Sequence, residues 1–226
     1  MLLSLPNWLI HISSSIEWGI AALLLYRYGT LIGRKDVRRF GLFMIPHWIG
    51  SWFVLAYHVS GDTIPLLLDL SETVNLFGSI FLLSASLGIL KTIKTGSAEG
   101  IMASLGLLLI ARPQSFMGED VFDAILQISS VVYLCFLISL LVIRKRDPEL
   151  FPGLMIFGFW FVLVFISVTV GFMYLSTELR AYPTLSHDDL LHGAAESLLT
   201  ISNLLIVIGV HGRIKRMENR QAALRG

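Results

Sequence analysis

Long apolar runs constrain this chain more than any other feature of its sequence. A transmembrane helix needs about 20 predominantly apolar residues. Six runs of about this length occur: Trp8–Tyr28, Phe40–Tyr57, Pro65–Leu90, Val121–Ile143, Phe151–Leu175 and Asp189–Val210. Because only 15% of the residues are charged, a soluble fold would lack the polar side chains to cover its surface. The sequence therefore predicts an all-α, polytopic transmembrane helix bundle.

The distribution of lysine and arginine predicts how this bundle is oriented, because basic residues favour the cytoplasmic side. Basic residues cluster at Arg34–Arg39, Lys91–Lys94, Arg144–Arg146 and Arg213–Arg216, whereas the loop with Asp62 carries none. Only one long run lies between the clusters at Lys91–Lys94 and Arg144–Arg146, which would place these two clusters on opposite sides of the membrane. All four clusters can be cytoplasmic only if the shorter apolar run Ile101–Ala111 also enters the membrane. We therefore predict seven passes, with the N-terminus outside and the C-terminus in the cytoplasm. Six passes plus one re-entrant or interfacial segment is the alternative.

The chain is expected to consist of two three-helix membrane units. The segment KTGSAEG, which begins at Lys94, is small, polar and typical of a linker. The predicted organisation is a first unit over residues 1–93, a linker with the short apolar run over 94–120, a second unit over 121–212 and a basic cytoplasmic tail over 213–226. No basic region precedes the first apolar run, so we interpret it as a retained helix rather than a signal or transit peptide.

Ionisable side chains interrupt the apolar runs, where they cost free energy and usually face the bundle interior or a wet cavity. On the last run, His192, Glu196 and Asn203 share one stripe because of their helical spacing. In the predicted orientation, the polar residues of the first, third and last runs lie in the outer half of the bilayer, and His58 ends the second run. We predict that ligand-binding residues lie at this level, in one site or in two, and that they are His11, Glu17, His58, Glu72, Asn75, His192, Glu196 and Asn203.

Four interpretations of these residues stay open, of which an ion or solute path is the least favoured because the sequence has no matching pair of helices broken by glycine or proline. The polar groups can be satisfied pairs that fix helix packing, or the imidazoles can ligate the magnesium of a chlorophyll or the iron of a haem. Buried carboxylates beside histidines can instead move protons or stabilise positive charge on an apolar substrate. The sequence has no HExxH or HxxEH motif, and its single cysteine, Cys135, excludes a cysteine-based metal site. We therefore predict no site for a free metal ion.

Two parts of the chain resemble known families. The opening LSLPNWLIHISSSIEWGIAALLLYRYG, followed by AYHVSGD and LSETVNLFGS, resembles the hypothetical chloroplast reading frame forty-nine family over roughly residues 1–95. The stretch LHGAAESLLTISNLLIVIG, with GFWFVLVFISVTVGFMY before it, resembles a second uncharacterised cyanobacterial and plastid family over roughly residues 120–212. The resemblance implies a fusion of the two families in a cyanobacterial thylakoid or plasma membrane. Around His58 this chain has SWFVLAYH, where the first family has a segment rich in cysteine, threonine and tryptophan.

The resemblance supplies no settled activity, so two functions are expected. The first is a non-enzymatic accessory or assembly protein of a photosynthetic membrane, which holds chlorophyll, carotenoid or another prenyl lipid and contacts photosystem or other complex subunits. The alternative is a membrane-embedded isomerase or cyclase that acts on an apolar isoprenoid. In it, Glu72 and Glu196 would donate protons or stabilise a cation, and His11 or His192 would tune them. The near balance of 17 basic and 16 acidic residues argues against a nucleic-acid partner.

Overall fold

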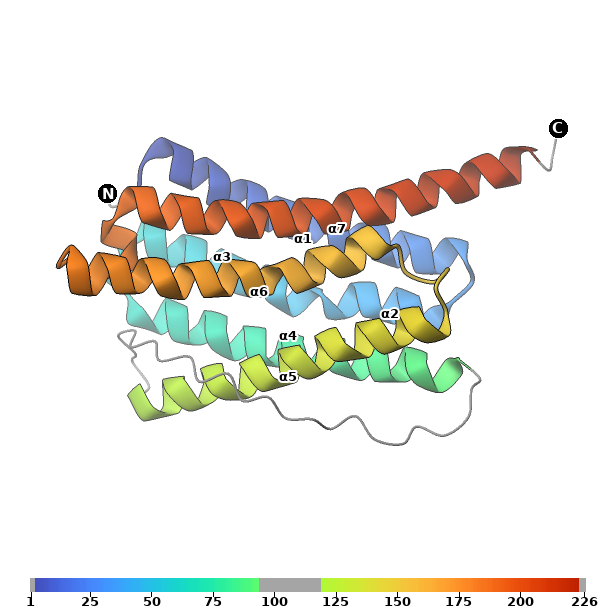
Figure 1. Cartoon of the computed structure of the whole chain (residues 1–226), viewed down its shortest axis with the longest axis horizontal. Helices are drawn as coiled ribbons and strands as arrows, with labels where there is room; N and C mark the ends of the chain where they lie inside the picture. Colours follow the sequence, from blue (N-terminus) through green and yellow to red (C-terminus); the bar gives the residue numbers. More distant parts are fainter. Residues whose placement is uncertain (1–2, 94–118, 224–226) are drawn as a thin grey trace.

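The described part of the chain is entirely helical. The computed structural model describes residues 3–93 and 119–223, and no strand occurs within these two ranges. Six helical segments there are long and apolar enough to cross a membrane. The expected all-α class with membrane-spanning helices is therefore confirmed (Figure 1). The predicted short segment Ile101–Ala111 lies outside the described residues.

The helices follow the predicted apolar runs closely. Their bounds are α1 Leu5–Leu31, α2 Lys35–Phe43, α3 Ile45–Val59, α4 Pro65–Thr92, α5 Glu119–Arg146, α6 Gly153–Tyr174 and α7 Asp189–Ala223. A π-helical turn, η1 (Leu175–Leu179), continues α6, and a 3-10 turn, η2 (Leu185–His187), precedes α7. Regular helices are expected here because a membrane offers no water to satisfy free backbone groups.

The predicted span over Phe40–Tyr57, in which Pro46 indicates a kink, is divided into two helices. Met44 separates α2 from α3. Pro46 accounts for the break because proline has no N–H to donate and its ring disfavours a preceding helical turn. In the first turn of α3 the missing N–H costs nothing. The Met44 carbonyl accepts a hydrogen bond from Nε1 of Trp18 (2.9 Å), which ties the break to α1.

The bundle has an acidic end and a basic end, named here for Asp62 and Asp189 at one and Arg34 and Arg213 at the other. At the acidic end, the backbone N–H of Ser4 donates to Oδ1 of Asp189 (2.8 Å), so α1 and α7 begin together. At the basic end, Arg34 donates to Oγ1 of Thr92 (3.0 Å) and lies 3.8 Å from Asp147. Helices α1, α4 and α5 therefore all end at the basic end, as the distribution of lysine and arginine predicted.

The two predicted units share one core. Helix α1 lies beside α7 and helix α4 beside α5, so helices far apart in the sequence are neighbours (Figure 1). The core accordingly combines Leu25 and Phe40 from the first unit with Phe136, Phe159 and Val210 from the second. Many other large apolar side chains remain exposed on the outside of the bundle, as expected for a surface that faces lipid tails. The boundary between the units is a feature of the sequence rather than of the packing.

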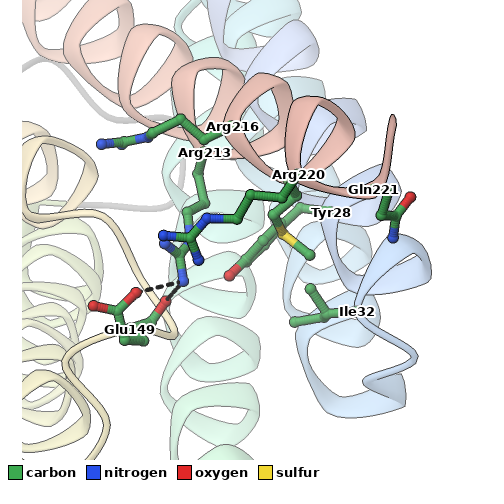
Figure 2. A pocket seen from close by; sticks show the side chains of 8 residues that line it. Tyr28, Ile32, Glu149, Arg213, Arg216, Arg220 and Gln221 are labelled. Atoms are coloured by element: carbon green, nitrogen blue, oxygen red, sulfur yellow. Dashed lines mark hydrogen bonds and ion pairs between the residues drawn. The ribbon is translucent and has the colours of Figure 1, made fainter. Parts of the chain in front are cut away.

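Helix α7 is longer than the other helices and extends past the bundle at the basic end (Figure 1). Its 35 residues span about 52 Å at 1.5 Å per residue, against a hydrocarbon core of about 30 Å. Near this end, side chains of α7, of α1 and of the α5–α6 loop line an open cavity of about 410 Å³ (Figure 2). The last turns of α7 therefore lie at or beyond the headgroup layer.

Candidate metal centre

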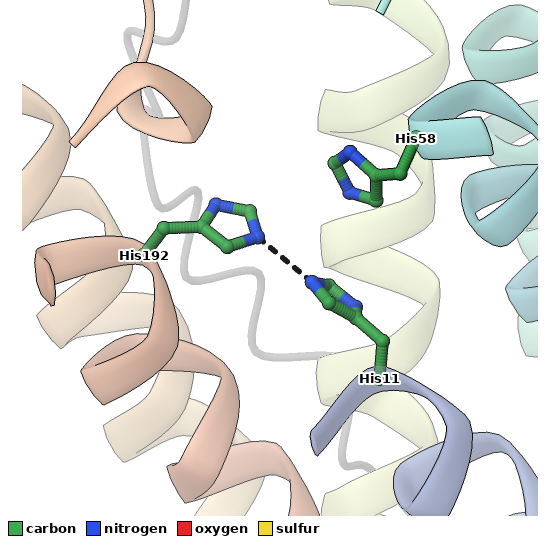
Figure 3. Close-up of side chains that lie close together, drawn as sticks. All are labelled: His11, His58 and His192. Atoms are coloured by element: carbon green, nitrogen blue, oxygen red, sulfur yellow. Dashed lines mark hydrogen bonds between the residues drawn. The ribbon is translucent and has the colours of Figure 1, made fainter. Parts of the chain in front are cut away.

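Three histidines from separate segments meet at the acidic end of the bundle. His11 comes from the second turn of α1, His58 from the last turn of α3 and His192 from the first turn of α7. One nitrogen of each ring lies within 4.8 Å of one nitrogen of the other two. Figure 3 shows the rings pointing toward one another from three sides. All three residues are 6–7% exposed, so the cluster is buried.

Hydrogen bonds between α1 and α7 hold two of these histidines in place. One turn before His11, the side-chain amide of Asn7 donates to the backbone carbonyl and to Oδ1 of Asp189, both at 2.7 Å. On the other side of the histidines, the amide of Asn203 donates to the carbonyl of Ser14 (3.0 Å). Because these hydrogen bonds flank the histidine pair, α1 and α7 are fixed relative to each other at this level.

A glycine permits the close contact beside His192. A Cβ atom built on Gly193 would collide with the amide group of Asn7. Glycine therefore lets the Asn7 side chain reach Asp189 across the helix interface. Membrane helices commonly have small residues where they contact one another closely.

One carboxylate is within hydrogen-bond distance of a histidine ring, and a second lies near another ring. Oδ1 of Asp62 lies 2.8 Å from Nδ1 of His58, and both side chains are nearly fully buried. Oε2 of Glu196 lies 3.7 Å from Nδ1 of His11. The Nδ1 atom of each ring therefore faces an acid, while Nε2 of His11 lies 2.8 Å from Nε2 of His192. A carboxylate behind an imidazole is the arrangement that fixes the tautomer of histidines that bind metals.

The spacing of the nitrogens is close to what one metal ion needs. A tetrahedral zinc ion with bonds of about 2.0 Å places its ligand nitrogens about 3.3 Å apart. The separation of 2.8 Å between the His11 and His192 nitrogens would open slightly, and the longer separations, up to 4.8 Å, would close by rotation of the rings. Asp62 and Glu196, when ionised, balance the charge of a divalent cation. The donor set therefore fits a metal ion in both geometry and charge.

The other predicted site residues lie in two further places. Asn203 ties α7 to α1 as described. Asn75, on α4, donates weakly to Oγ of Ser71 (3.4 Å) and lies against Gly50 of α3. Glu72 lies on this same helix, α4, and Glu17 lies on α1 with its Oε2 atom buried and without a hydrogen bond among the described residues. The structure thus gathers His11, His58, His192 and Glu196 and leaves Glu17, Glu72 and Asn75 outside the histidine cluster.

Three residues that support the cluster were not predicted as site residues: Asn7, Asp62 and Asp189. Asp62 follows His58 by four residues, and Asn7 precedes His11 by four. These spacings place side chains together on one helical face or turn. Asp62, however, lies beyond the end of α3 in a left-handed backbone conformation (φ 61°), which helical spacing does not predict.

Comparison with known proteins assigns the chain to a family. A Ycf49-like protein of Synechocystis sp. is 31% identical over 86 residues, which cover 37% of this chain and 83% of the relative. The chain belongs to the Ycf49-like family. Residues 2–88 match the family described as protein of unknown function DUF2499, and residues 122–215 match protein of unknown function DUF3593. The predicted fusion of two uncharacterised families is therefore confirmed. No solved structure matches the chain.

The histidine cluster draws on both matched regions of this Ycf49-like chain. His11 and His58 lie in the first region, whereas His192 and Glu196 lie in the second. The three imidazoles therefore come together only where α1 packs against α7 and the His58 ring at the end of α3 meets the His192 ring.

Proposed function

We propose that this protein is an integral membrane protein that binds a first-row transition metal ion through His11, His58 and His192. The observation that carries the proposal is the convergence of three buried imidazoles, with nitrogens within 4.8 Å of one another. Placing three such rings together in an apolar bundle is costly unless they are satisfied. A shared cation satisfies all three at once.

The ligand chemistry favours zinc or copper. Neutral imidazoles suit Zn²⁺, Cu²⁺ and Fe²⁺, whereas Mg²⁺ and Ca²⁺ prefer oxygen ligands. Three protein ligands leave one coordination position for water or a further group. The carboxylates of Asp62 and Glu196 approach the Nδ1 atoms, on the outer sides of the rings. They therefore orient the ligands, and neither is directed at a bound water as a general base.

The geometry favours an ion over a chlorophyll or a haem at this position. A tetrapyrrole between His11 and His192 would have to separate α1 from α7, because their Nε2 atoms are only 2.8 Å apart. The hydrogen bonds of Asn7 and Asn203 resist that separation on both sides. A metal ion needs only small rotations of the rings. This proposal departs from the sequence analysis, which predicted no free metal ion.

Metal content of the purified protein tests the proposal. The chain would be purified in mild detergent without a metal-affinity tag, loaded with Zn²⁺ or Cu²⁺, washed and measured by inductively coupled plasma mass spectrometry. We expect one ion per chain, lost in His58→Gln and His192→Gln. His211→Gln is the matched control, because His211 is exposed on α7 near the basic end. Equal metal content in all four proteins would refute the site, as would a tetrapyrrole absorption band that disappears in the His192 variant.

We further propose that the protein acts as a non-enzymatic accessory or assembly factor in a thylakoid-type membrane, with the acidic end in the lumen. The Synechocystis relative and the concentration of basic residues at one end of the bundle support this. The isomerase or cyclase alternative needs Glu72 and Glu196 to act together, but they lie on α4 and α7, and Glu196 is paired with His11. Stoichiometric complex subunits that co-purify with the tagged chain would support the accessory role, and a chain isolated alone would count against it.

A further inference from the structure

Three arginines line the cavity at the basic end. Arg213, Arg216 and Arg220 of α7 line it together with Gln221 and Met217, opposite Tyr28 and Ile32 of α1. Figure 2 shows Arg220 extending over the cavity beside Tyr28, while Arg213 reaches Glu149. The cavity measures about 410 Å³ and is open to the outside of the bundle, so a group can enter it without moving a helix.

The charges around this cavity are not balanced within the described structure. The lining holds three arginines and one carboxylate, Glu149, so it carries a net charge of +2 (three minus one). Glu149 lies 2.9 Å from Arg213 but is itself 78% exposed. Arg220 makes no hydrogen bond or ion pair with any residue that the structure describes, and Arg216 donates only to the carbonyl of Gly212, within its own helix. Like charges spaced along one helix repel one another, which favours binding of an anion.

The position of the cavity indicates where that anion comes from. Helix α7 is longer than the hydrocarbon core is thick, and the arginines lie in its last third. Ile32 and Met217 add an apolar wall to the same cavity. The cavity combines cationic side chains with an apolar wall at the depth of the lipid headgroups. An anionic lipid fits both parts, because its acidic headgroup is covalently linked to its apolar chains. Basic pockets between transmembrane helices on the cytoplasmic side characteristically bind acidic headgroups.

We propose that this cavity binds the phosphate or sulfonate headgroup of an anionic membrane lipid. Arg216 and Arg220 donate to the headgroup oxygens, since guanidinium groups bind such oxygens with paired hydrogen bonds. Arg213 stays paired with Glu149 and holds the α5–α6 loop against α7. Ile32 and Met217 contact the lipid next to the headgroup. The site lies at the opposite end of the bundle from the histidine cluster and does not depend on the proposed metal.

Native mass spectrometry of the full-length, delipidated protein tests the proposal, with phosphatidylglycerol as the anionic probe and phosphatidylcholine as the zwitterionic one. We expect phosphatidylglycerol to bind preferentially, and Arg216→Gln with Arg220→Gln to weaken that binding about tenfold or more, because two charge-assisted contacts are lost. The matched control is Lys145→Gln with Lys215→Gln, which removes two exposed cations from the same end without touching the cavity.

Each outcome decides between the possible sources of the anion. Equal binding of both lipids, or an equal loss in the arginine and lysine variants, would overturn the proposal and indicate general attraction by a basic surface. Displacement of phosphatidylglycerol by millimolar inorganic phosphate would overturn the lipid assignment and indicate a site for a free anion. Circular dichroism and gel filtration of each variant confirm that the compared proteins are folded.

Discussion

Replacing Asp62 by asparagine tests how far the metal centre depends on the acid behind His58. Oδ1 of Asp62 lies 2.8 Å from Nδ1 of His58, and the two side chains are 6% and 4% exposed. The change removes one negative charge and keeps the size of the side chain. It also keeps the backbone, because asparagine tolerates the left-handed conformation of this position (φ 61°) as well as aspartate does.

The expected loss follows from the role of such acids. Removing a carboxylate that hydrogen-bonds a metal-binding histidine lowers metal affinity by about 10- to 100-fold, or about 1.4–2.8 kcal/mol at 1.4 kcal/mol per factor of ten. Zinc affinity would be measured in detergent by competition with a chromophoric chelator. Glu178→Gln is the control, since Glu178 is an exposed acid in η1, just beyond α6. An Asp62→Asn affinity within twofold of the control would refute the orienting role.

A second measurement separates this role from a merely structural one. The amide oxygen that replaces the carboxylate still accepts from Nδ1 of His58 but without the negative charge, so the metal-free protein also loses about 1 kcal/mol of stability. The increase in melting temperature on adding zinc reports metal binding alone, because binding to the folded state adds stability by mass action. We expect that increase to shrink in Asp62→Asn and to stay unchanged in Glu178→Gln. A lower melting temperature with an unchanged zinc-induced increase would assign Asp62 to folding only.

Three other predictions concern the same part of the molecule. Gly193→Ala should destabilise the protein by about 1–3 kcal/mol, measured by thermal melting, because its methyl group collides with Asn7; Gly212→Ala, which meets open space, is the control. Acidification should release the metal, because protons compete for the imidazoles; a zinc content that stays unchanged down to the pH at which the protein unfolds would contradict histidine ligation. Residues 1–93 and 94–226, co-expressed as separate chains, should co-purify because α1 packs against α7; independent elution would contradict the shared core.

The sequence predicts the helices well because the membrane imposes their length and polarity. Within the described residues, each of the six long apolar runs is helical, and Phe40–Tyr57 is divided at Met44, close to the kink that Pro46 indicates. The alternation of basic and acidic connections also predicted which helix ends lie together, as the contacts of Arg34 and Asp189 confirm. Each of these features depends on the sequence of a single helix or a single loop, and not on which helices are neighbours.

The composition of the site was harder to predict because it depends on which helices are neighbours. Helical spacing placed His192 and Glu196 on one stripe, but it could not show that α7 lies beside α1 rather than beside α4. The depth of the eight predicted residues therefore left open whether they form one site or two. The packing gathers His11, His58, His192 and Glu196 and places Asn75 at the α3–α4 contact. The sequence predicts how deep a residue lies in the membrane. Which neighbouring helix its side chain meets depends on how the helices pack.

The division of the histidine cluster between the two matched regions sets the order in which the protein matures. During synthesis His11 and His58 enter the membrane early, but His192 emerges more than 130 positions after His58. Until α7 has inserted and closed against α1, the earlier histidines have no third partner. Metal loading would thus mark the completion of insertion, and a chain stalled before its last helix would stay empty.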